Sequence, residues 1–278
     1  MIKLSKVQLR KLQMIELEML IEVDRICRKC NIKYNILAGT MLGAVRHNGF
    51  IPWDDDADIG MLRDEYEKFR KACKTELDTT RFYFQDYRKT KGYRWGYGKI
   101  RRKKTLFLRE NQDHMPYEQG VFIDIFPLDG VPDNYFFRIL HDISCFCIRK
   151  TLWSEVGRFT EENILKRMAF KILNKIPEKT IKKILYRFEK FSNRKETKYV
   201  RMLMFPTPNK VRGFKREWYK NLCEIEFEKK DLYGVKDADE YLSFTYGNYM
   251  EFPPIEERKV HPVSKIHLID VEFNDEEK

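Results

Sequence analysis

Apolar residues recur along the chain at spacings that predict both helices and strands. From Leu4 to Cys30 they follow one another at steps of three and four residues, which marks one face of a helix. Further helices are predicted over 63–77, 134–153, 161–176, 178–191 and 237–250, and strands over 34–38, 57–62, 81–87, 120–126, 199–205 and 222–227. The glycine-rich and aromatic segment 92–108 is expected to form a hairpin. Helices therefore dominate directly after Pro132.

Positive charge is concentrated in this later part of the chain. The net charge is +11, and residues 149–220 alone contain 21 lysines and arginines against 7 acidic residues. The rest of the chain is slightly acidic. We place a domain boundary at Asp133, where the predicted helices begin. The start of the chain lacks the apolar core of a secretory signal, and no run is apolar enough to span a membrane. A cytoplasmic protein without disulfides between its six cysteines is expected.

The densest polar feature is a group of four aspartates, Asp54, Asp55, Asp56 and Asp58, between two apolar segments. Carboxylates this close repel one another unless a cation neutralises them. On a strand, Asp56 and Asp58 project from one face, with Asp54 on the same side if the strand extends back to it, while Ala57 packs on the other. Oxygen ligands of this kind suit Mg²⁺ or Mn²⁺. The alternative is a solvated acidic turn.

A fifth carboxylate lies inside an apolar strand. Asp124 interrupts the segment from Val121 to Phe126, where an unpaired buried charge would cost several kcal/mol, on the order of 2–7 for a polar group without a partner. A neighbouring metal or a cationic side chain would offset this cost. Asp124 is therefore either a third metal ligand, a general base, or one half of a buried ion pair with an arginine.

Residues around the aspartates suggest a binding site for phosphate. The Gly39-Thr40 pair allows close backbone approach and offers amide and hydroxyl donors. Arg46 and His47 could contact phosphate or hold the aspartate loop in place. Trp53 could pack this loop, or stack on a base or a quaternary ammonium group.

Two further sets of basic residues allow two interpretations each. Lys99, Arg101 and Lys104 could neutralise a second phosphate or lie on a solvated surface. The helices predicted over 161–176 and 178–191 are amphipathic and basic. They could lie on an anionic membrane, or pack on the core with a solvated basic side.

Three sequence blocks closely resemble the LicD family. They are Gly39–His47 continued by Ile51–Ile59, then Gly120–Gly130, and finally Tyr246–Met250 with Pro253, Pro254, Arg258 and His261. The similarity runs from Ile26 to His261, and the first block is the longest and most specific. Two positions depart from the family pattern: Asn248 stands where Asp is more common, and Ala57 replaces Ile or Val.

The resemblance implies a fold and an activity. The fold is α/β (α+β): a nucleotidyltransferase-like mixed sheet flanked by helices, with a helical carboxyl-terminal part. The activity is transfer of phosphocholine, or a similar phospho-alcohol, from a CDP-linked donor to a hydroxyl of a cell-surface glycan such as lipopolysaccharide or teichoic acid. The animal relatives, fukutin and fukutin-related protein, move ribitol phosphate from CDP-ribitol. Family motifs place phosphate at Gly39-Thr40 and metal at Asp56 and Asp58, completed by Asp124.

The expected mechanism follows from these roles. Mg²⁺ or Mn²⁺ is held by four carboxylates, those of Asp54, Asp56, Asp58 and Asp124. A sugar hydroxyl attacks the distal phosphorus in line, CMP leaves, and Asp124 or a metal-bound hydroxide takes the proton. Lys99 and Arg101 support the leaving phosphate. Residues 1–133 would form the catalytic core, and 134–278 would complete the site and bind a glycolipid acceptor or the inner membrane surface.

Two rival functions fit part of the sequence. The first is transfer of a nucleoside monophosphate itself to a small molecule. The second is a basic module that binds nucleic acid or membrane without catalysis. Asp124 argues against this module, because a binder has no need of a carboxylate in an apolar strand. No nucleic acid is expected as a partner.

Overall fold

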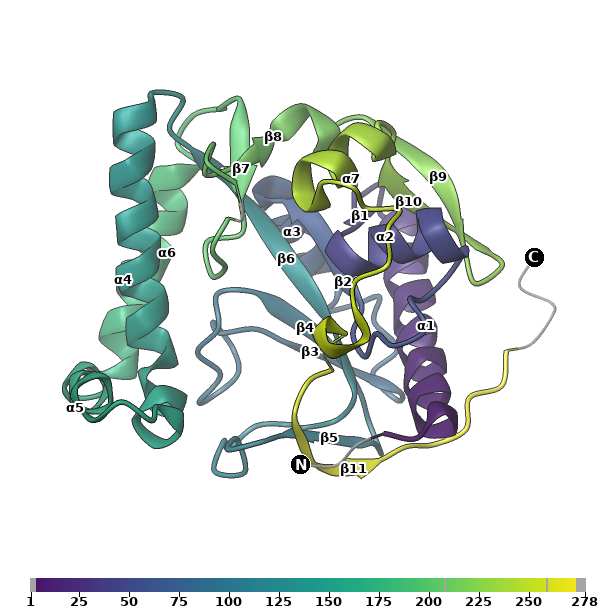
Figure 1. Cartoon of the computed structure of the whole chain (residues 1–278), viewed down its shortest axis with the longest axis horizontal. Helices are drawn as coiled ribbons and strands as arrows, with labels where there is room; N and C mark the ends of the chain where they lie inside the picture. Colours follow the sequence, from purple (N-terminus) through teal and green to yellow (C-terminus); the bar gives the residue numbers. More distant parts are fainter. Residues whose placement is uncertain (1–3, 208, 259, 274–278) are drawn as a thin grey trace.

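The computed structural model describes residues 4–207, 209–258 and 260–273 (Figure 1). The helices are α1 (Lys6–Lys29), α2 (Ala38–His47), α3 (Arg63–Ala72), α4 (Tyr135–Thr160), α5 (Ile164–Leu173), α6 (Glu178–Ser192) and α7 (Ala238–Tyr246), with short 3-10 helices at Arg216–Tyr219 and Ile255–Glu257. The strands are β1 (Asn35–Ile36), β2 (Asp58–Leu62), β3 (Phe82–Gln85), β4 (Gly98–Arg102), β5 (Leu106–Arg109), β6 (Phe122–Val131), β7 (Tyr199–Arg201), β8 (Phe214–Lys215), β9 (Leu222–Phe227), β10 (Lys230–Val235) and β11 (Val263–His267).

A mixed sheet forms the centre of the molecule, in the order β1-β2-β6-β4-β3. Strands β2 and β6 run parallel, and the other neighbours in this order are antiparallel. The long strand β6 also pairs through its last residues with β7, which in turn pairs with β8. The predicted mixed sheet flanked by helices is therefore confirmed. Because β7 and β8 follow α6 in the chain, the later part of the sequence contributes strands to the same sheet as the earlier part.

The regular spacing of apolar residues along α1 places them on one side of the helix, which is buried in the hydrophobic core. Its apolar positions, among them Ile15, Met19, Val23 and Ile26, are fully buried in the main hydrophobic cluster, and its start is closed by a capping box on Ser5. A second, smaller cluster lies between α4, α6 and the segments around 87–97 and 203–204. In Figure 1, α4 and α6 stand side by side, with α5 across their lower end.

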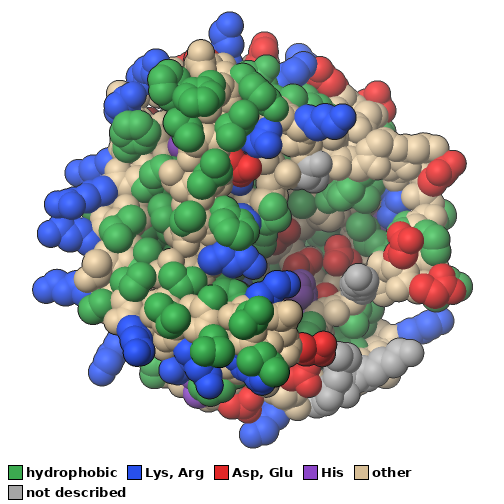
Figure 2. Space-filling view, turned by 60° about the vertical axis from the view of Figure 1, so that its left-hand side comes forward, with side chains coloured by type: hydrophobic (Ala, Val, Ile, Leu, Met, Phe, Trp, Pro, Cys, Tyr) green, Lys and Arg blue, Asp and Glu red, His purple; other side chains and the backbone are tan. Residues whose placement is uncertain are grey.

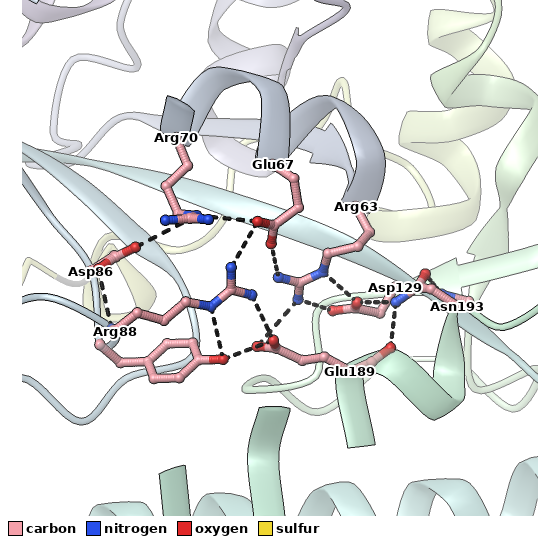
Figure 3. A network of polar contacts seen from close by, with 10 residues as sticks. Arg63, Glu67, Arg70, Asp86, Arg88, Asp129, Glu189 and Asn193 are labelled. Carbon is pink, nitrogen blue, oxygen red and sulfur yellow. Dashed lines mark hydrogen bonds and ion pairs between the residues drawn. The ribbon is translucent and has the colours of Figure 1, made fainter. Parts of the chain in front are cut away.

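A buried network of charges fastens α6 to the sheet (Figure 3). Arg63 at the start of α3 donates two hydrogen bonds to Asp129 of β6, at 2.7 and 2.6 Å. Arg88 bridges Glu67 of α3 and Glu189 of α6, at 2.7 and 2.9 Å. Each buried carboxylate of this network thus faces a guanidinium group, which is the condition for keeping such charges inside a protein.

One expected element is wrong. Segment 92–108 does not form a hairpin, because β4 pairs with β3 and β6, whereas β5 pairs with β11. The turn at Lys104, whose φ is +62°, leads the chain out of the central sheet instead of folding it back. The long helix predicted from residue 134 extends further than expected, to Thr160. The boundary placed at Asp133 falls between β6 and α4 and stays a prediction.

Candidate functional site

Three neighbouring strands bring two acidic side chains and one basic side chain into register. Asp58 of β2 lies opposite Asp124 of β6, and Asp124 lies opposite Lys99 of β4. The Lys99 ammonium is ion-paired with the Asp124 carboxylate, and both side chains are buried. The alternative of a buried ion pair at Asp124 is therefore realised, with a lysine where the sequence suggested an arginine.

The aspartate loop approaches the same point from β2. The Asp124 amide donates to the Ala57 carbonyl at 3.0 Å, so the strand pairing extends one residue before Asp58. Ala57 is fully buried, as the predicted alternation requires. The Asp55 carboxylate accepts hydrogen bonds from the backbone amide of His261 at 2.8 Å and from its Nδ1 at 3.1 Å. The same Nδ1 lies 3.7 Å from Asp56 Oδ2, so His261 lies beside both carboxylates.

Burial and mutual repulsion disfavour the charged forms of these carboxylates. Burial, followed by repulsion from Asp56 and Asp124, raises the pKa of Asp58 well above its ordinary value. Burial and repulsion from Asp56 likewise raise the pKa of Asp54. The pKa of Asp56 is also raised, chiefly by burial, although nearby His261 opposes the shift. The cluster is thus short of positive charge.

The sequence pattern missed a further carboxylate here. Glu16, on a buried turn of α1, has an Oε2 atom without a hydrogen-bond partner among the described residues. Burial and then repulsion from Asp56 raise the pKa of Glu16 well above its ordinary value. In the sequence, only the spacing of Glu16 relative to the apolar residues of α1 could have indicated that this carboxylate is buried. Its neighbour Gln13 donates to the Asp54 carbonyl at 3.0 Å and supports the loop.

The Gly39-Thr40 pair lies in the first turn of α2, beside the aspartates. The Thr40 hydroxyl oxygen accepts the Asp58 amide at 2.8 Å, which leaves the hydroxyl hydrogen available as a donor. A Cβ atom on Gly39 would lie 2.8 Å from the Asp54 Oδ2 atom, so only glycine leaves this carboxylate in place. The amides at the start of a helix favour anions nearby.

Arg46, His47 and Trp53 form a separate cluster at the other end of α2. Arg46 donates to the Tyr249 carbonyl at 2.8 Å, and His47 and Trp53 pack edge to face with their ring centroids 6.3 Å apart. The Arg258 guanidinium lies 4.1 Å from the Trp53 ring centroid. In the structure these residues hold the aspartate loop and the 249–258 segment together; their predicted contacts with substrate stay a prediction.

A cavity of about 260 Å³ adjoins the carboxylates on the other side of Lys99. Five cationic side chains line it together with aromatic residues, and the cations are Lys99, Arg101, Arg109, Arg149 and Lys150. Burial lowers the pKa of Lys99 to about 7, and Arg109 and Arg101 add to the effect while Asp124 opposes it. Arg101 donates to the Gly120 carbonyl at 2.7 Å, whereas Arg109 has an Nε atom without a hydrogen-bond partner among the described residues.

Lys104 does not reach this cavity and is exposed, so its alternative as a solvated surface residue is confirmed. The aromatic lining, which includes Trp95, Tyr97, Tyr117 and Trp153, was not predicted. Trp153 and Arg149 come from α4, and no sequence pattern indicates that this helix lines the same cavity as residues of β4 and β5. Figure 2 shows acidic side chains at the floor of a hollow, with a histidine at its edge.

The carboxylates do not form a closed metal site by themselves. Within residues 4–207, 209–258 and 260–273, no three His, Cys, Asp or Glu side chains are grouped closely enough to hold an ion. Their chemistry nevertheless fits a hard divalent cation, because Asp54, Asp56 and Asp58 offer only oxygen donors and have raised pKa values that a cation would relieve.

The site thus combines carboxylates on adjoining strands of a mixed sheet with a Gly-Thr helix start beside them. Residues 31–138 match the family described as LicD/FKTN/FKRP, nucleotidyltransferase domain. The resemblance to the LicD family is therefore confirmed over these residues.

Relatives extend the similarity beyond this domain. The chain is 26% identical over 274 residues to the lipopolysaccharide cholinephosphotransferase LicD of Haemophilus influenzae, an alignment that covers 96% of this chain and 100% of that protein. Short segments match uncharacterized proteins of Rickettsia typhi, 48% identical over 50 residues, and of Rickettsia prowazekii, 52% identical over 44 residues. These two alignments cover 18% and 16% of this chain, and 16% of each relative.

Proposed function

We propose that this protein is a metal-dependent phosphotransferase that moves phosphocholine, or a similar phospho-alcohol, from a CDP-linked donor to a hydroxyl group of a cell-surface glycan. The observation that carries the proposal is the register of Asp58, Asp124 and Lys99 beside the start of α2. The full-length similarity to a protein named lipopolysaccharide cholinephosphotransferase supports the transferred group and the kind of acceptor.

Asp56 and Asp58 would hold Mg²⁺ or Mn²⁺, with Asp54 and Asp124 beside them. The raised pKa values of the first three aspartates support this assignment, since a bound cation would remove the repulsion between them. When bound, the ion would neutralise part of the diphosphate charge and polarise the phosphoryl group.

The chain's own residues would then position the reactants. The acceptor hydroxyl oxygen forms a bond to the distal phosphorus while the bond from that phosphorus to the bridging oxygen breaks, and CMP leaves with the electron pair. Asp124 takes the hydroxyl proton. Lys99 and Arg101, joined by Arg109 with its unpartnered Nε, stabilise the leaving phosphate from the cavity side. The Thr40 hydroxyl donates to a phosphate oxygen.

The test measures CMP release by the purified chain from CDP-choline, CDP-ribitol and CDP-glycerol, with Mg²⁺ and a glycan acceptor. We expect Asp58→Asn and Asp124→Asn to reduce turnover at least about 100-fold, because each removes a charge at the reacting centre. Asp231→Asn, which changes an exposed aspartate of β10, serves as the matched control and should be neutral. Turnover within about tenfold of wild type in either site variant would refute the assignment.

The mass of the product separates this proposal from transfer of a nucleoside monophosphate. An acceptor that gains a phospho-alcohol while CMP appears supports the proposal. Release of pyrophosphate from CTP, with an acceptor that gains CMP, would support the rival instead.

A further inference from the structure

Helices α4 and α5 expose an unusual number of large apolar side chains. Of the 21 large hydrophobic residues that are exposed in the described part of the chain, 12 lie on α4 and α5. In the space-filling view they gather on one face, with Lys and Arg side chains around them, on the same side as the acidic hollow (Figure 2). Patches of this kind on a protein surface usually mark an interaction site.

The orientation of α5 is the clearest sign. Leu165, Met168 and Ile172, which share one side of this helix, are 78%, 56% and 65% exposed. On the opposite side, Phe170 is buried against Gly157 of α4, where an added Cβ would lie 2.7 Å from its ring. Phe170 is the one buried residue of α5, and the helix turns Leu165, Met168 and Ile172 outward, the reverse of ordinary core packing.

Helix α6 behaves differently and provides an internal comparison. Its apolar residues Ile181 and Leu185 are buried in the second hydrophobic cluster. Core packing with a solvated basic side, one of the two alternatives for these helices, is thus confirmed for α6 and wrong for α5.

The charge of this face is positive. Residues 164–175 contain Lys166, Arg167, Lys171 and Lys175 and no acidic residue. The acidic residues of α4 are already paired: Asp142 with Arg201 and Arg212, and Glu155 with Arg94 and Arg158. Within the described part of the chain, Lys166, Arg167, Lys171 and Lys175 form no ion pair with an acidic side chain.

We propose that the exposed apolar side chains of α4 and α5, here called the docking face and represented by Phe136, Leu140, Ile143, Leu165, Met168 and Ile172, bind the surface of an anionic lipid bilayer. Apolar residues surrounded by lysine and arginine suit the boundary between lipid headgroups and acyl chains. A second copy of this chain would bring the same positive charge against itself, so it is a poorer occupant. No helix in the described ranges is long and apolar enough to cross a membrane, which fits attachment from one side.

A groove beside the docking face strengthens the choice of lipid. It has a volume of about 490 Å³ and lies between α4 and α6, with Phe137, Leu140, Phe188 and Phe191 among its walls. Arg194 and Lys195 also line it. Apolar walls with two cations fit an acyl chain joined to a phosphate headgroup. This surface goes beyond the proposed transfer reaction and does not depend on it.

The experiment is sedimentation of the full chain with vesicles. We expect at least tenfold tighter binding to vesicles of phosphatidylcholine with 30% phosphatidylglycerol than to phosphatidylcholine alone, and weaker binding at 500 mM than at 100 mM salt. The triple variant Leu165→Ser, Met168→Ser, Ile172→Ser should lose at least tenfold in vesicle binding at an unchanged melting temperature. Val7→Ser, an equally exposed apolar position on α1, is the matched control and should bind like the wild type.

Each outcome decides the proposal. Equal binding to both kinds of vesicle, or full binding by the triple variant, would overturn it. A wild-type dimer that the triple variant dissociates, without any vesicle binding, would assign the docking face to a second copy instead. CMP release with a water-soluble acceptor should be the same in wild type and triple variant, so a failure here is distinguishable from a failure of the proposed reaction.

Discussion

The buried pair of Arg63 and Asp129 permits a quantitative prediction of stability. Asp129 is fully buried and accepts two hydrogen bonds from Arg63 and a third from Asn193 Nδ2 (Figure 3). Replacing Arg63 with Met removes the cation but keeps much of the apolar stem. Asp129 would then retain only the hydrogen bond from Asn193 Nδ2, and Glu189 would retain those from Arg88 and the Tyr87 hydroxyl.

Removing one partner of a buried ion pair costs about 3–5 kcal/mol, because the other charge stays buried without compensation. We therefore expect Arg63→Met to lower the free energy of unfolding by this amount, a large fraction of the roughly 5–15 kcal/mol of an ordinary domain. Asp129→Asn should cost less, about 1.5–3 kcal/mol, because Arg63 keeps Glu189 at 3.5 Å and Glu67 at 3.6 Å.

Urea unfolding followed by circular dichroism measures these differences. Arg70→Met is the matched control: Arg70 belongs to the same network, but its side chain is 17% exposed against 8% for Arg63, and it lies 4.0 Å from Asp86. We expect it to cost at most about 1 kcal/mol. If Arg63→Met costs less than about 1 kcal/mol, or no more than Arg70→Met, the reasoning about buried charge is wrong.

Two further predictions concern the active site and pH. Gly39→Ala should reduce CMP release at least tenfold with little change in melting temperature, because the new Cβ displaces the Asp54 carboxylate while alanine suits a helix; unchanged activity would contradict this. Burial, with nearby Arg201 adding to it, lowers the pKa of His141 to about 4 from an ordinary 6.5. As the pH drops, the unfolded chain therefore gains a proton at His141 before the folded chain does. The free energy of unfolding should fall between pH 6.5 and pH 4 by up to about 3 kcal/mol. His141→Gln should remove that part of the loss, and parallel stability curves for the two proteins would refute the assignment.

Local patterns predicted the parts of the site that lie close together in the chain. Alternation predicted that Ala57 packs into the core beside Asp58, and an isolated carboxylate in an apolar strand identified Asp124 as a buried charge. The periodicity of α1 located a long buried helix. In each case the information lies within one element, where side-chain direction follows from the period of the backbone.

The parts of the fold and of the site that local patterns did not predict depend on pairings between distant segments. Lys99 meets Asp124 only because β4 pairs antiparallel with β6, a register that neither strand specifies alone. His261 reaches Asp55 across 206 positions. Periodicity also shows that α5 has an apolar side but not whether anything covers it, so its exposed face became visible only with the packing of Phe170.

The electrostatics of the two halves of the site bear directly on the proposed donor. Carboxylates with raised pKa values lack positive charge, while the neighbouring cavity, where burial and adjacent guanidinium groups lower the pKa of Lys99, lacks negative charge. The Lys99–Asp124 ion pair lies between the carboxylate cluster and the cationic cavity, and it neutralises only one charge of each. A free nucleotide would satisfy the cavity alone, and a free cation the carboxylates alone. A divalent cation bound to a diphosphate would supply both charges in one ligand, and this complementarity is the reason for proposing a metal-bound diphosphate donor over either component alone.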